Sequence, residues 1–165
     1  MNLTERLLDS DYRMKQSMLQ MARLLSDAQL DAPLAFRHSL MPFVEPEKTL
    51  RETLDRMVAD GWVLTMLDAV DWKPSDPHYR AFSGKSVEEM ITRLNGYHAD
   101  FSAFVSKVEA EDAWETQWVD RTCESEETFT YGGVIEGVLT WGIPQRIKAQ
   151  QLLGQLGLNV GLPLL

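Results

Sequence analysis

The chain has little cysteine, no long apolar run and few basic residues for its acidic content. Cys123 is its single cysteine, which excludes an intramolecular disulfide framework and a Cys-x-x-Cys pair of metal ligands. We expect its thiol to lie inert in a loop. No run of about eighteen apolar residues is present, which excludes a membrane-spanning helix. The N-terminus also lacks the cationic and apolar segments of a secretory signal, so we expect a cytoplasmic protein.

Acidic residues dominate the charge, with 25 Asp and Glu against 16 Lys and Arg and a net charge of -9 at pH 7. A surface of this sign repels a phosphate backbone, and the basic residues form no cluster that would reverse it locally. No basic amphipathic segment suggests a membrane surface. We therefore expect neither nucleic acid nor a membrane as a partner.

The chain is rich in helical periodicity, because apolar residues recur at spacings of three and four. Two Ser/Thr-x-x-Glu pairs, Thr49 with Glu52 and Ser86 with Glu89, predict reciprocal capping at helix starts. Gly157 is the residue type that commonly follows a helix C-terminus. The predicted helices cover residues 3–29, 50–71, 86–110 and 132–156.

Long connections separate these helices. Prolines break helical structure in residues 31–48 and 72–85, and two short extended pieces are predicted at 117–122 and 127–131. On the first helix, the buried stripe is predicted to contain Leu3, Leu7, Met14, Met18, Met21 and Leu25, with their neighbours Leu8 and Leu24. A chain of 165 residues with four long helices predicts an all-α fold, one bundle domain over residues 1–165, in which functional groups project inward.

The last predicted helix carries the most specific pattern, Trp141-Gly-Ile-Pro-Gln-Arg-Ile-Lys-Ala-Gln-Gln-Leu-Leu-Gly-Gln-Leu-Gly157. This segment resembles the final helix of the DinB-like (DinB/YfiT-type) family, whose pattern is His-x-x-His-His-Arg-Gly-Gln followed by an apolar run and Leu-Gly. The resemblance covers the whole chain in helix order and length. It implies a four-helix bundle of the up-down-down-up type with long connections.

The same resemblance implies a divalent metal, held by one histidine of the second helix and two histidines of the last at i and i+4. Aligning the arginine of the pattern with Arg146 puts the last-helix ligand positions at Trp141 and Gln145. The second-helix position falls on Met57, or on Arg56 if the register shifts by one residue. None of these side chains replaces an imidazole ligand. We therefore expect a degenerate metal site, with no metal and no cofactor.

The surroundings of this degenerate site allow two interpretations. The polar residues near it are Asp60, His98, Gln145 and Arg146. They either converge into a pocket, with Asp60 paired to an arginine, or lie exposed and apart from one another. Trp141 is expected to point its indole into the bundle, where it would fill the volume that a metal and its waters occupy in relatives.

Two classes of function follow from the resemblance. We favour a non-catalytic or small-molecule-binding protein of the DinB-like superfamily that forms a homodimer through helix faces, because five Trp and eight Met give an apolar surplus. The alternative is a metal-dependent enzyme of that superfamily, a thiol S-transferase, isomerase or hydrolase with a displaced metal site. Fold alone does not decide between them, since one bundle hosts many functions.

Overall fold

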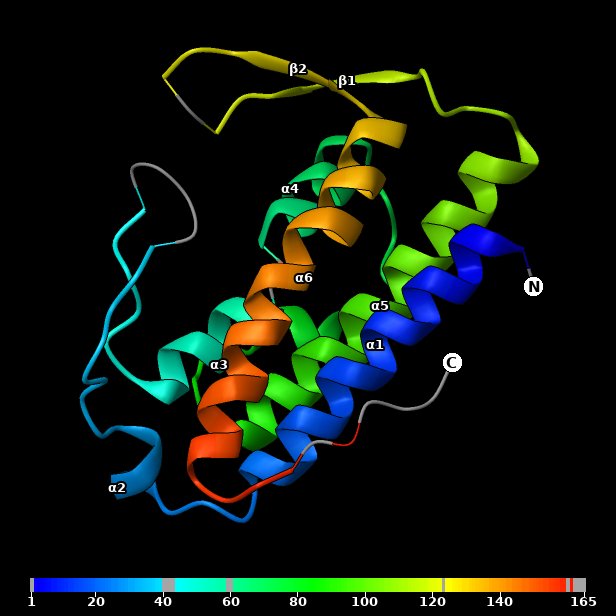
Figure 1. The fold of residues 1–165 in the computed structure, drawn as a ribbon. Coiled ribbons are helices and arrows are strands. Elements are labelled where there is room, and N and C mark those ends of the chain that lie inside the picture. Colours follow the sequence, from blue (N-terminus) through cyan, green and yellow to red (C-terminus); the bar gives the residue numbers. More distant parts are fainter. Residues whose placement is uncertain (1, 40–43, 59–60, 123, 160, 162–165) are drawn as a thin grey trace.

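The computed structural model describes residues 2–39, 44–58, 61–122, 124–159 and 161, and it is largely helical (Figure 1). The helices pack together, with a small antiparallel hairpin at one end. None of the helices in these ranges is both long enough and apolar enough to cross a membrane. The elements are α1 Leu3–Ala22, α2 Asp27–Leu30, α3 Leu50–Val58, α4 Gly61–Ala69, the 3-10 helix η1 Pro77–Ala81, α5 Val87–Ala110, β1 Gln117–Asp120, β2 Glu127–Thr130 and α6 Tyr131–Gln155.

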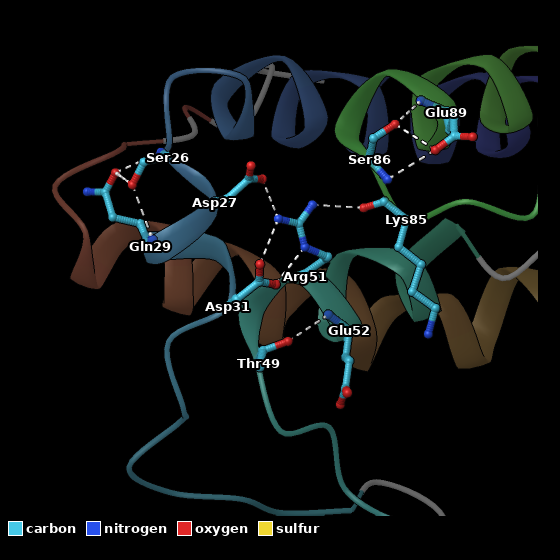
Figure 2. Close-up of polar contacts among 10 residues, drawn as sticks. All are labelled: Ser26, Asp27, Gln29, Asp31, Thr49, Arg51, Glu52, Lys85, Ser86 and Glu89. Carbon is cyan, nitrogen blue, oxygen red and sulfur yellow. Dashed lines mark hydrogen bonds and ion pairs between the residues drawn. The ribbon is translucent and has the colours of Figure 1, made fainter.

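The first predicted helix, 3–29, is divided into α1 and α2. A new N-cap at Ser26 makes the division: its hydroxyl accepts from the Gln29 N–H at 3.3 Å, and the Gln29 side chain accepts from the Ser26 N–H at 2.9 Å (Figure 2). Reciprocal capping of this kind satisfies the N–H groups of a new helix start. The prediction of one continuous helix was therefore wrong beyond residue 22.

Arg51 of α3 holds α2 in place. Its guanidinium donates to Asp27 at 2.6 Å, to Asp31 at 2.6 Å and to the backbone carbonyl of Lys85 at 3.0 Å (Figure 2). The three acceptors belong to α2, to the residue after it and to the segment that leads into α5. One exposed ionic cluster thus joins three parts of the chain that are distant in sequence.

The second predicted helix, 50–71, corresponds to α3 and α4, and residues 59–60 lie outside the described residues. Its start at residue 50 is confirmed, but half of the capping is different. Thr49 Oγ1 accepts from the Glu52 N–H at 3.2 Å, whereas the Glu52 carboxylate accepts from the Lys48 N–H at 2.7 Å. The carboxylate therefore caps the chain one residue earlier than expected.

The start of α5 is as predicted, with Ser86 and Glu89 forming the reciprocal capping pair. The connection before α5 packs along it through Tyr79, which is 2% exposed and whose hydroxyl donates to Asp100 at 2.5 Å. Gly96 of α5 makes room for this ring, since a β-carbon there would lie 2.1 Å from a Tyr79 ring atom. The connection is thereby fixed to the bundle.

The two predicted extended pieces are confirmed as a hairpin, in which β1 and β2 pair antiparallel with Trp118 opposite Phe129. α6 follows the hairpin directly, and the Thr130 hydroxyl caps its first turn. At the other end of α6, Gly157 has a φ of 80°, the left-handed conformation expected after a helix C-terminus.

α1 lies beside both α5 and α6 (Figure 1). It runs antiparallel to α5, since Asn2 at its start binds Glu109 near the end of α5, and Arg23 after its end binds Glu88. α6 runs in the same direction as α1 and also packs on α3. Side chains from all the long helices and from Trp118 of β1 form a continuous apolar core.

The buried face of α1 differs from the predicted one. Leu3 and Leu7 are 72% and 47% exposed, so their assignment to the buried stripe was wrong. Asp11 and Lys15 are buried instead, at 6% and 1% exposure. Buried charges require partners, and these partners come from α1 itself and from α6.

Candidate functional site

Ionisable side chains lie buried between α1 and α6. Lys15 Nζ is 2.9 Å from Asp11 Oδ2, one helical turn away. Arg146 of α6 approaches the other oxygen, with its Nε 3.2 Å from Asp11 Oδ1, and its Nη1 donates to Met14 Sδ at 3.2 Å. The Arg146–Asp11 contact is an ion pair without hydrogen-bond geometry. The Asp11 carboxylate therefore lies between two cations.

Gly142 allows this ionic cluster to pack against α6. A β-carbon at position 142 would lie 3.5 Å from Asp11 Oδ1 and 3.8 Å from Lys15 Nζ. A larger side chain would therefore enter the volume that the ion pair occupies. Ala149 is also buried, two turns further along, so small residues recur on the inner side of α6.

Glu47, in the segment before α3, provides a second buried carboxylate and is 2% exposed. Gln145 Nε2 donates to its Oε1 at 2.8 Å, and Arg56 Nη1 lies 3.1 Å from the same oxygen. Lys148 Nζ donates to its Oε2. This carboxylate also lies between two cations, one from α3 and one from α6.

Glu47 remains ionised in this environment. Burial acts to raise the pKa of its carboxyl, but the hydrogen bonds from Lys148 and Gln145 outweigh that effect, and the pKa lies below the ordinary 4.5. Lys148 also donates to the backbone carbonyl of His38 at 3.1 Å. The ionic cluster thus connects α6 with the chain segment that precedes α3.

A cleft of about 520 Å³ opens beside Lys148, between residues 34–38 and the C-terminal half of α6. This volume is within the range of about 300–1,000 Å³ that is typical of small-molecule sites. The side chains that line it are mostly apolar, and the few polar ones belong to α6 and to residue 38. The apolar ones include Leu34, Phe36, Pro144, Ile147 and Leu152, and the polar ones are His38, Lys148, Gln151 and Gln155.

No protein-family model, curated protein or solved structure matches the chain. What this site can do is therefore inferred from its own side chains and not from relatives. Across the described part of the chain, no three His, Cys, Asp or Glu side chains lie together in a way that could hold a metal ion.

The positions aligned with metal ligands have different surroundings. Met57 is fully buried in the apolar core. Trp141 is 55% exposed, so the prediction that its indole fills the interior was wrong. The reason is rotational, because successive helical residues differ by about 100° and the neighbouring Gly142 faces α1. The structure does not bring Trp141 and Met57 together inside the bundle.

Two members of the predicted polar pocket do lie inside, but they bind different acids. Gln145 binds Glu47, and Arg146 binds Asp11. Asp60 lies outside the described residues, as does Cys123.

His98 of α5 contacts α1. Its ring stacks on Tyr12 with centroids 4.0 Å apart and an interplanar angle of 9°. Burial lowers its pKa below 6.5, although Asp9 and Asp11 act in the opposite direction. His98 is thus a half-buried aromatic contact between helices.

Sequence reasoning missed Asp11, Lys15, Glu47 and Lys148. A signal existed for the first pair, because Asp11 and Lys15 are spaced i and i+4 on the helix face that also holds Leu8. Glu47 gave no such signal, since it lies in a proline-rich connection without periodicity. Its partners Gln145 and Lys148 are about 100 positions away in the chain.

Proposed function

We propose that this protein is a non-catalytic, small-molecule-binding helical bundle of the DinB-like kind, with ion pairs where the family has its metal centre. The order of the long helices supports the proposal. Further support comes from Gln145 and Arg146, the residues aligned with the family pattern, because both bind acids that are buried.

The positive charges around the buried carboxylates support the proposal that this protein binds no metal ion. Asp11 and Glu47 each have a cationic side chain on either side. A divalent cation needs oxygen, nitrogen or sulfur ligands whose lone pairs are free to coordinate it. At either carboxylate here, it would meet two like charges within a few ångströms, which disfavours its binding.

Metal analysis of protein purified without a His tag tests this part. The protein is incubated with zinc, nickel or manganese, dialysed and measured by elemental analysis, beside a known zinc protein as positive control. We expect much less than one ion per chain. One tightly held ion per chain would contradict the proposal and favour the alternative, a metal-dependent enzyme with a displaced site.

The cleft beside Lys148 supports the proposal that the protein binds a small molecule. A neutral apolar dye, N-phenyl-1-naphthylamine, should bind there saturably with increased fluorescence. Ile147 lines the cleft and is 50% exposed, so Ile147→Asp should abolish binding without unfolding the chain. Ile143 is 45% exposed on the same helix and does not line the cleft, which makes Ile143→Asp the matched control. Equal dye binding by both variants would reject the cleft as the site.

We also propose that the protein forms a homodimer through exposed apolar side chains of α6. Trp141 and Ile143 are 55% and 45% exposed, and exposed apolar side chains on one helix favour association. Sedimentation of the wild type and of Trp141→Lys at several concentrations tests this. We expect a dimer that Trp141→Lys weakens, and a wild type that stays monomeric throughout would exclude it.

A further inference from the structure

The residues that line the cleft differ from the rest of the chain in charge. Acidic residues outnumber basic ones by 25 to 16 in the whole chain. Among the described residues that line the cleft, none is acidic, whereas His38 and Lys148 carry basic side chains. The cleft therefore combines an apolar surface with positive charge in a protein that is otherwise strongly negative.

The positive charge of Lys148 is only partly compensated. Its ammonium group donates to Glu47 Oε2 and to the His38 carbonyl, which are acceptors for two of its three N–H bonds. Glu47 cannot neutralise Lys148 fully, because Arg56 lies 3.1 Å from the same carboxylate. One carboxylate is thus shared by two cations, and of these Lys148 is the one that lines the cleft.

The burial of Glu47 keeps this charge in place. The Glu47 carboxylate is 2% exposed, and the Lys148 side chain is 16% exposed. Water therefore screens the pair less than it would screen a surface pair. The cleft is also lined by Phe36 and Ile147, large apolar residues that are 80% and 50% exposed. An occupant would cover them.

We infer that the cleft binds an apolar carboxylic acid as its anion, with the carboxylate near Lys148 and the apolar body against Phe36 and Ile147. The inference rests on the proposed small-molecule-binding function and adds the class of ligand. A carboxylate would accept a charge-assisted hydrogen bond from the third N–H bond of Lys148. The apolar body would remove the exposed rings and aliphatic groups from water.

Matched ligands test the ligand class. 1-Naphthoate, 1-naphthalenemethanol and 1-naphthylmethylammonium share a ring system and differ in charge, and their affinities are measured by calorimetry near neutral pH at low salt. We expect 1-naphthoate to bind about tenfold more tightly than the alcohol, the gain of one charge-assisted hydrogen bond. The amine should bind most weakly, and added salt should reduce the advantage of the acid.

Two variants assign the preference to Lys148. Lys148→Met should remove the advantage of 1-naphthoate over the alcohol, whereas Lys148→Arg should retain most of it. If the alcohol or the amine binds wild type as tightly as the acid, the inference fails while small-molecule binding stands. If none of the three ligands binds and the neutral dye also fails, the proposed function fails as well.

Discussion

The buried and exposed ionic clusters of this protein have opposite compositions. Asp11 and Glu47 are buried acids, each between two cations, whereas Arg51 is a cation between two acids at the surface (Figure 2). The acids bound by Arg51 have side chains that are 88% and 52% exposed. Water solvates the excess negative charge of that cluster, whereas among the cations of the buried clusters only Arg56 has ready access to water, with a side chain that is 40% exposed.

This difference changes what each cluster contributes. The hydrogen bond from Arg51 lowers the pKa of Asp31, an exposed group that water would also keep ionised. Burial opposes ionisation of Glu47, and only its donors keep the pKa low. The exposed cluster therefore joins chain segments, whereas the ionised acids of the buried clusters depend on their cationic partners.

The largest expected effect is that of removing the buried acid between α1 and α6. Asp11→Asn keeps the shape but leaves Lys15 and Arg146 without a counter-charge, and we expect a loss of about 3 kcal/mol in the free energy of unfolding. Asp9→Asn is the control, because Asp9 pairs with Arg13 at the surface of the same helix. Urea unfolding measures both. Equal losses would show that burial does not distinguish these acids.

Sequence reasoning predicted the fold best where local chemistry decides it. The capping pair at Ser86 and the extended pieces around Trp118 and Phe129 depend on nearby residues, and the structure contains both. The helical division at Ser26 was also locally encoded, by Ser26 and Gln29, but the apolar periodicity that continues through Leu25 concealed it. Local sequence signals therefore predicted the structure where no second signal, such as a continuing apolar periodicity, pointed to a different one.

The candidate site was harder to predict because its partners come from distant segments. Gln145 and Arg146 were named as possible pocket residues, with an exposed set as the alternative, and the acids they bind lie in α1 and before α3. Trp141 was misplaced because a motif alignment does not give the rotation of a helix. The burial of Gly142 and Ala149, spaced seven residues apart, defines that rotation, and small residues are weak signals in an apolar pattern.

An intermediate effect is expected from pH. The pKa of Glu47 is lower in the folded protein than its ordinary value of 4.5, so its contribution to stability is present above that pH. The contribution is lost as the pH falls through the folded pKa. Glu47→Gln should therefore be less stable than wild type at neutral pH, and its unfolding free energy should fall less steeply in acid.

Denaturant unfolding at neutral pH and at several pH values below 4.5 measures the difference between the two proteins. Glu45→Gln removes a negative charge from an exposed position two residues away and controls for the change in net charge. If Glu47→Gln and wild type lose stability in parallel, the Glu47 cluster does not contribute to the acid sensitivity.

The smallest effect is expected at the surface cluster. Asp31→Asn leaves Arg51 with Asp27 and the Lys85 carbonyl, and the site is open to water. We expect a change in urea stability far below that of Asp11→Asn, and one that salt reduces further. A loss as large as that of Asp11→Asn would mean that Arg51 stabilises the bundle as strongly as the buried pairs do. In that case the connection of α2 to α3, and not desolvation, would govern the stability of both regions.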